Sequence, residues 1–257
     1  MIFQRAFLKL PSQTRASKVA RRASHESTLQ RFWKTVNVSS SLEGYKVLLD
    51  ACPIKTLTKQ DLTIPSDKKD LAYAIAHEWD SLRNSKVKHY ELPITSIVSR
   101  AIYMEPQEAR KTVLLYLKGD TVLYLSEADQ CDGKLRAIQE AEFPRLKEWA
   151  EDLWQTKLGF STGFGAPFVE KPSYVYEWVC SLDNWQLAGL ERGVIAMKSL
   201  ILGAALIEGR ISAEQCVYLA RLEVALQSQR WGEVEDGHDV DHEDLKRQVG
   251  SVSAVVS

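Results

Sequence analysis

The chain has 257 residues, of which 45% are hydrophobic and 26% are charged, and its formal net charge is −1. A chain of this length and composition can bury a sizeable core as one large domain or two smaller ones. Its most apolar region, residues 187–207, is interrupted by Glu191, Arg192 and Lys198, which excludes a membrane span and predicts a buried helix.

The first 25 residues carry six lysines and arginines but no acid, and their first ten residues fit a short amphipathic helix. This pattern predicts a mitochondrial transit peptide over residues 1–30 and a protein of the mitochondrial matrix. The alternative is a basic disordered arm that touches nucleic acid or lipid. Cleavage near residues 22–24 would shift the net charge from −1 to about −7. Such an acidic body disfavours nucleic-acid or membrane binding and favours basic or amphipathic protein surfaces.

Residues 32–65 contain short β-type runs separated by serine, glycine and proline, with a turn expected at Ser39–Ser41. They predict a small antiparallel sheet. A helix is predicted over 67–83, with Ser66 or Asp67 as its N-cap, and it can cover one face of that sheet. The apolar side of this helix carries Leu71, Ile75, Trp79 and Leu82.

From Pro93 onward the pattern is mainly helical. Helices are expected over 94–104, from Pro106 to about 120, from Pro144 to about 158, from about 182 to Glu208, and from Ser212 to about Arg230. The last of these begins with a Ser212/Gln215 capping box. We therefore predict an α+β fold, with an antiparallel β-rich domain and one covering helix over 31–95 and an all-helical domain over 96–257.

No motif predicts catalysis or a bound cofactor. The glycine-rich loop at 159–172 lacks the Gly-Lys-Ser/Thr end of a phosphate loop and the GxGxxG spacing of a dinucleotide site, so a flexible interhelix loop is expected. No serine or cysteine has the local context of an activated nucleophile. The cysteines have no paired spacing, which predicts free thiols in a reducing compartment. They are Cys52, Cys131, Cys180 and Cys216.

Residues 231–244 form the most unusual stretch, with seven carboxylates and two histidines after one tryptophan and no basic residue. If the carboxylates point toward one centre they could bind a metal ion. If they point away from one another into solvent, they form an anionic surface for a basic partner. His238 and His242 are four residues apart, but the sequence between them fits neither a zincin nor an EF-hand motif. Gly237 also disfavours a helix start, so a solvated acidic turn or protein-binding face is favoured.

Upstream, Glu223 lies on the surface of a largely apolar predicted helix. An ion pair with Arg221 or Arg230 is the simplest interpretation of this carboxylate. Contact with a partner is the alternative. Trp231 is a candidate anchor for such a partner, because tryptophan is enriched at binding hot spots.

The motifs FWKTVNV, GYKVLLD, LAYAIAHEWDS, ARLE and WGEVEDGHDVD occur here in this order. Together they resemble the family of mitochondrial assembly chaperones that attend the alpha subunit of the ATP synthase catalytic head. The resemblance covers nearly all of the chain after residue 31. It implies a non-enzymatic matrix chaperone, without metal or cofactor, that binds the unassembled alpha subunit and prevents its aggregation until it pairs with the beta subunit.

Three residues depart from the family pattern, namely Cys52, Leu57 and Tyr103, and all lie outside the terminal acidic motif. The runner-up hypothesis is a metal-dependent matrix hydrolase built on the C-terminal Glu, Asp and His residues. A scaffold for another partner is a third. Nothing in the sequence demands more than a monomer. The predicted client contacts are Glu223, Trp231, Glu233, Glu235, His238, Asp239 and Asp241.

Overall fold

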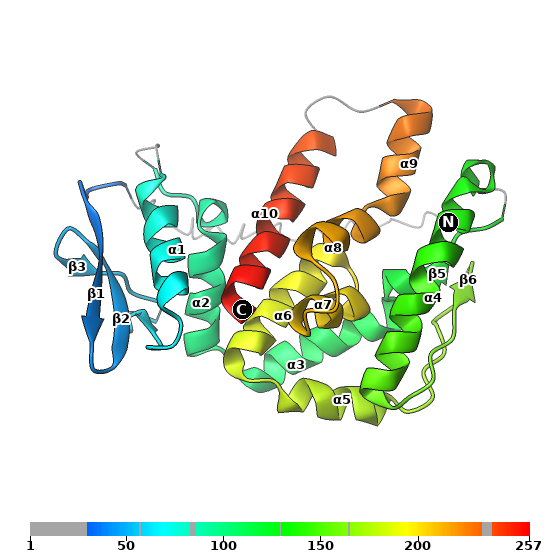
Figure 1. Ribbon diagram of the computed structural model, residues 1–257, viewed down its shortest axis with the longest axis horizontal. Coiled ribbons are helices and arrows are strands. Elements are labelled where there is room, and N and C mark those ends of the chain that lie inside the picture. The colour runs from blue at the N-terminus through cyan, green and yellow to red at the C-terminus, as the bar shows by residue number, and fades with distance from the viewer. Residues whose placement is uncertain (1–29, 57, 83–85, 129, 164, 233–237) are drawn as a thin grey trace, which may run out of the picture.

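The computed structural model describes residues 30–257 except 57, 83–85, 129, 164 and 233–237. A small sheet lies at one end of the molecule, and the rest is mainly helical (Figure 1). The predicted α+β class is confirmed, because an antiparallel sheet near the N-terminus precedes a mainly helical region. The predicted transit peptide falls almost entirely outside the described residues.

Four strands make the N-terminal sheet, in which β2 is central and every pairing is antiparallel. β1 pairs along one edge of β2, whereas β3 and β4 pair with opposite ends of its other edge. The serines expected to form a turn are the end of β1, and the reversal lies at residues 42–43. The strands are β1 Val36–Ser41, β2 Gly44–Leu49, β3 Cys52–Pro53 and β4 Thr63–Ile64.

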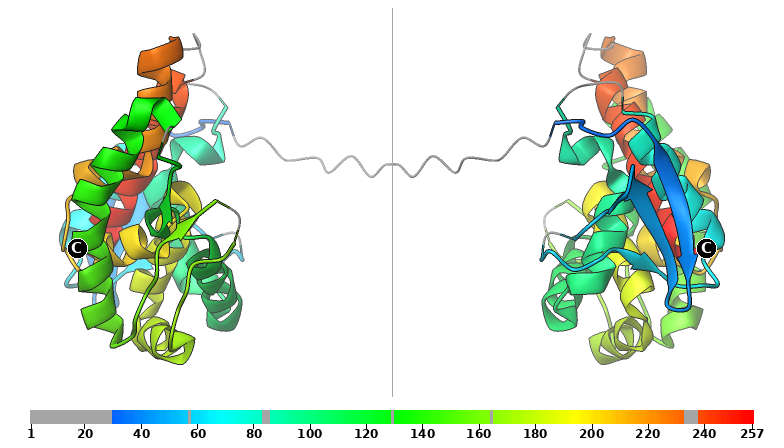
Figure 2. Two further views of the ribbon diagram at one scale, coloured as in Figure 1. Left: turned by 90° about the vertical axis from the view of Figure 1, so that its right-hand side faces the viewer. Right: turned by 90° about the vertical axis from the view of Figure 1, so that its left-hand side faces the viewer.

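Helix α1, Lys69–Asp80, covers one face of this sheet, as predicted (Figure 2, right). Leu71, Ile75 and Trp79 are buried against it, so the apolar spacing of four residues identified the correct face. The N-cap position is Lys68 rather than Ser66 or Asp67, and no side chain caps the helix there.

The remaining described elements are mostly α-helices, with four short 3-10 turns and one pair of two-residue strands. They are η1 His89–Glu91, α2 Pro93–Tyr103, α3 Pro106–Leu115, η2 Tyr116–Gly119, η3 Thr121–Leu123, β5 Tyr124–Leu125, η4 Gln130–Gly133, α4 Lys134–Trp154, β6 Ser161–Thr162, α5 Pro172–Ser181, α6 Asn184–Met197, α7 Leu200–Ile207, α8 Ala213–Ala220, α9 Leu222–Trp231 and α10 His238–Val256.

Several helix boundaries differ from the prediction. α4 begins at Lys134 and contains Pro144, because burial of Phe143 and Leu146 on both sides of the proline offsets the lost backbone hydrogen bond. The expected single helix from 182 to Glu208 is broken into α6 and α7 at Lys198, which has a left-handed φ of 58°. The helix expected to continue to Arg230 is likewise interrupted between α8 and α9.

Helix α10 was not predicted from the sequence, although it lies at the centre of the fold. It packs on α6, α2 and α8, and its Val249, Val252 and Val255 are fully buried (Figure 1). Close approach to α6 requires a glycine, since a Cβ at Gly189 would lie 2.6 Å from a methyl group of Val256. The last helix is therefore part of the core rather than a peripheral tail.

The glycine-rich loop is more ordered than expected for a flexible connection. β6 pairs in parallel with β5, and Leu158 forms an antiparallel bridge with Val169. Within the described part of the chain, no helix is both long enough and apolar enough to cross a membrane. The predicted boundary between residues 95 and 96 falls inside α2, and the division into two domains remains a prediction.

Candidate recognition surface

The acidic stretch is only partly described, because residues 233–237, including Glu233 and Glu235, lie outside the described residues. Its first residue, Trp231, ends α9, and its second half, from His238, forms the start of α10. The two helices end and begin on the same side of the molecule (Figure 1). The described second half of the stretch, residues 238–244, thus forms the first two turns of a helix rather than a turn.

Negative charges favour the start of α10, although Gly237, just before it, disfavours helix formation. Asp239 and Asp241 lie in the first turn of α10, where the helix dipole favours negative charge. Both are exposed, and between them the apolar side chain of Val240 is 61% exposed. We call Asp239, Val240 and Asp241 the acidic face. Successive residues of an α-helix project about 100° apart, so these three side chains point in different directions around its exposed first turn.

The later acids of the stretch are engaged within α10. Glu243 accepts a hydrogen bond from Lys246 at 2.7 Å, which lowers the pKa of its carboxyl group. Asp244 accepts hydrogen bonds from Arg247 and Gln248. These contacts brace the helix, so the acids of the stretch divide into exposed and internally paired groups.

Glu223 lies in the first turn of α9, whereas Trp231 is the last residue of that helix. They are eight positions apart in the helix, which corresponds to about 12 Å at 1.5 Å per residue. The Glu223 carboxylate accepts a hydrogen bond from Gln227 at 3.0 Å and is exposed. Arg230 forms an ion pair with Asp132 at 3.2 Å. The structure therefore places Glu223 at the opposite end of α9 from the acidic stretch.

Tyr90 lies next to α10 and was not among the contact residues predicted from the sequence. The guanidinium of Arg247 lies 5.7 Å from the ring centroid of Tyr90, and the Lys88 ammonium lies 5.3 Å from the same ring. Tyr90 remains 57% exposed in η1. The sequence alone does not reveal this arrangement, because Arg247 is more than 150 positions away from Tyr90.

A fully buried carboxylate, Asp120, has a structural role. It accepts hydrogen bonds from the Ser199 hydroxyl at 2.6 Å, from the Ile201 amide at 2.9 Å and from the Val122 amide at 3.0 Å. These bonds connect the start of α7 to η3, directly after the break that ends α6. Burial raises the pKa of Asp120 to about 6, against the hydrogen bonds that lower it.

The described residues offer little support for catalytic chemistry. Burial raises the pKa of the Cys216 thiol to about 12, which makes this cysteine a poor nucleophile. Cys52 and Cys180 are also free, as predicted for cysteines without paired spacing. No group of three or more His, Cys, Asp or Glu side chains gathers as a potential metal site in the described portion of the chain. The metal-dependent hydrolase is therefore not favoured.

Comparison with known proteins decides the family. A family model described as ATP12 chaperone protein matches residues 30–151. The protein named Protein atp12, mitochondrial, from Schizosaccharomyces pombe is 34% identical over 245 residues, which cover 90% of this chain and 83% of the relative. The chain belongs to the ATP12 chaperone family. Protein ATP12, mitochondrial, from Saccharomyces cerevisiae is 30% identical and covers 86% of this chain and 82% of its own length.

The fold agrees with this family. The crystal structure of Atp12 from Paracoccus denitrificans superposes with a TM-score of 0.72 at 29% identity, covering 88% of this chain and 97% of the other. The resemblance inferred from the motifs is confirmed, and so is the mitochondrial location. Membership in the ATP12 family also confirms that the protein is a chaperone of ATP synthase assembly and not an enzyme.

Proposed function

We propose that the client of this ATP12-family chaperone is the unassembled alpha subunit of the ATP synthase catalytic head. In this proposal the chaperone acts in the mitochondrial matrix and covers a surface of the alpha subunit until the beta subunit replaces it. The observation that carries the proposal is the acidic face, the exposed first turn of α10 with Asp239, Val240 and Asp241, in a helix whose last turns are buried in the core.

The geometry suits reversible binding. Exposed charges increase the rate and specificity of encounter more than they increase affinity. A helix anchored by buried valines presents its first turn without a large ordering cost on binding. An unassembled subunit exposes a surface that is meant to be buried, and a partner with a small charged contact surface can cover part of it and be displaced by a larger native interface.

The proposal is tested by charge reversal. We expect the Asp239→Lys/Asp241→Lys variant to capture purified, unassembled alpha subunit at least tenfold more weakly than the wild type, because it repels a basic client surface. The matched control is Glu148→Lys/Asp152→Lys, which makes the same change in net charge at two exposed positions of α4. The control should bind as the wild type does.

Two outcomes would contradict the proposal in different ways. Failure of the wild-type chain to bind the alpha subunit, in an assay where the protein is folded, would remove the alpha subunit as the client. Equal binding by the wild type and the Asp239→Lys/Asp241→Lys variant would instead remove the acidic face as the contact.

A further inference from the structure

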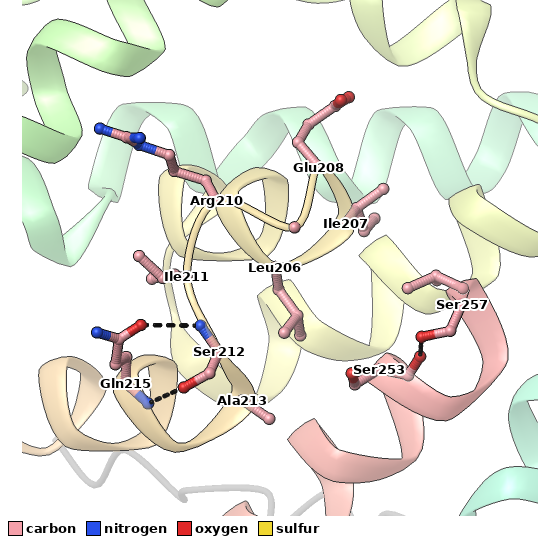
Figure 3. Close-up of a pocket in the computed structure, with 12 residues that line it drawn as sticks. Leu206, Ile207, Glu208, Arg210, Ile211, Ser212, Ala213, Gln215, Ser253 and Ser257 are labelled. Atoms are coloured by element: carbon pink, nitrogen blue, oxygen red, sulfur yellow. Dashed lines mark hydrogen bonds between the residues drawn. The ribbon is translucent and has the colours of Figure 1, made fainter.

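A groove lies at the other end of α10 from the acidic face. It is formed by two adjoining concavities of about 520 Å³ and about 330 Å³, which share Arg210, Ile211 and Gln215. The larger one runs between the turn that joins α7 to α8 and the last turn of α10 (Figure 3). The smaller one continues to α4 and the exposed face of α8.

Polar and apolar groups both line the groove. Its larger concavity is lined by the partly exposed side chains of Ile207, Ile211 and Val256, and the smaller one by Leu146 and by Tyr218 on α8. Tyr218 is 53% exposed. Both concavities are open to solvent along their length, which suits a polypeptide segment better than an enclosed small molecule.

Several polar groups in the groove already have partners within the protein. The Ser212 amide donates to the Gln215 side chain at 2.9 Å, and the Gln215 amide donates to the Ser212 hydroxyl at 3.2 Å, which closes the predicted capping box (Figure 3). The Glu208 carboxylate accepts a hydrogen bond from the Trp178 indole at 3.1 Å. These groups hold the walls of the groove in place.

The two arginines differ from these groups. Arg145 on α4 and Arg210 in the turn between α7 and α8 both line the smaller concavity and are exposed. Among the described residues neither guanidinium has a hydrogen bond, and neither has an acid within 4.0 Å, even though Glu142 lines the same concavity. Two cations without an ion pair among the described residues thus lie beside the apolar side chains of Leu146, Ile211 and Tyr218.

We propose that this Arg145–Arg210 groove binds an acidic segment of the client in which a carboxylate is flanked by apolar residues. The inference rests on the proposed function, since the segment is taken to belong to the alpha subunit. The arginines pair with the carboxylate, for which their planar guanidinium groups offer two parallel donors. The isoleucines take the apolar neighbours, and Tyr218 supplies the aromatic contact typical of binding hot spots.

The position of the groove gives the client two sites of opposite charge. α10 has 19 residues, which corresponds to about 28 Å at 1.5 Å per residue. The acidic face occupies its first turn, and the larger concavity borders its last turn. A client surface that matches both sites would be held in one orientation, because reversing it would place like charges together.

The first test is the Arg145→Glu/Arg210→Glu variant in a binding assay with purified, unassembled alpha subunit. We expect binding at least tenfold weaker than that of the wild type. The matched control, Lys111→Glu/Lys118→Glu, makes the same change in net charge at exposed lysines outside the groove and should bind as the wild type does. A milder pair, Arg145→Gln/Arg210→Gln, should weaken binding about threefold or more, and it covers the case in which charge reversal disturbs folding.

The second test places a photo-crosslinking amino acid at Tyr218 in the otherwise wild-type chain. The expected adduct is a peptide of the alpha subunit that contains Asp or Glu next to apolar residues. A crosslink to a second copy of the chaperone, or the absence of any crosslinked protein, would overturn the inference. So would equal binding by the wild type and both arginine variants, which would leave the proposed client intact. No binding by the wild type would instead overturn the proposed function together with this inference.

Discussion

Two groups of carboxylates in this protein have opposite surroundings. At the junction of α6 and α7, Asp120 is fully buried and accepts three hydrogen bonds from groups on two segments of the chain. At the start of α10, Asp239 and Asp241 are exposed and lie in the first turn of a helix. The first carboxylate fixes the positions of elements, whereas the other two present charge to solvent.

The difference separates stability from recognition. A buried carboxylate with several donors cannot be removed without leaving those donors unsatisfied, and that cost falls on the fold. An exposed carboxylate has lost little hydration and contributes little to stability, so it can be selected for binding alone. We therefore expect substitutions in the two groups to affect different measurements.

The largest effect is expected for Asp120→Ala. The change leaves the Ser199 hydroxyl and the Ile201 and Val122 amides without their acceptor in a buried site, and we expect it to lower the free energy of unfolding by about 3 to 5 kcal/mol. Chemical denaturation of the purified protein measures it. The comparison with exposed Asp152→Ala, for which a change below about 0.5 kcal/mol is expected, controls for loss of an acid. A loss below about 1 kcal/mol at Asp120 would show that the carboxylate does not hold the junction.

The pH dependence at Asp120 should be the next largest effect. Because the folded pKa is raised to about 6 from 3.8, the folded protein binds this proton more tightly than the unfolded chain does. The resulting stabilisation is fully present below pH 3.8 and is lost as the pH rises through about 6. The shift corresponds to about 3 kcal/mol at most.

Comparison with Asp120→Asn isolates this contribution, since other titrating groups cancel. We expect the excess stability of the wild type over this variant to shrink by about 2 to 3 kcal/mol between pH 4 and pH 7. Denaturation curves of both proteins across this range measure it. A difference that stays constant with pH would mean that Asp120 titrates normally.

The smallest effect on stability is expected for Asp239→Lys/Asp241→Lys. Loss of favourable charges at the helix start should cost less than about 1 kcal/mol. The same variant should lose most of its client binding, and binding by the wild type should weaken as salt rises from 50 to about 500 mM because exposed charges are screened. Loss of several kcal/mol in a denaturation experiment would place these acids with Asp120, as structural groups.

Local patterns in the sequence identified much of the fold. Strand-like runs predicted the sheet, and the spacing of Leu71, Ile75 and Trp79 predicted the buried face of α1. The Ser212/Gln215 capping box is present with both of its hydrogen bonds. Each of these features depends on residues that are close together in the sequence, which is why a single sequence was sufficient.

Features that depend on distant residues were not predicted. At the break between α6 and α7, Ser199 donates a hydrogen bond to Asp120, which is 79 positions away in the sequence. α10 was missed because its acidic start and Gly237 indicated a turn, although Val249, Val252 and Val255 repeat every three residues. The Arg145–Arg210 groove is lined by residues of α4, α7, α8 and α10 and of the turn between α7 and α8, and no local motif marks it. Of the seven predicted contacts, only Asp239, Asp241 and Glu223 are described together with their side-chain surroundings.

The order in which the fold can form is a consequence of where α10 lies. The Lys68 ammonium, just before α1, donates a hydrogen bond to the carbonyl oxygen of Val255, across 187 positions of sequence. Contacts between such distant segments require closure of long loops, and proteins rich in them fold slowly. We expect the core around α2, α6 and α8 to remain open until the last helix docks. During that interval the chaperone itself exposes apolar surface and is open to aggregation.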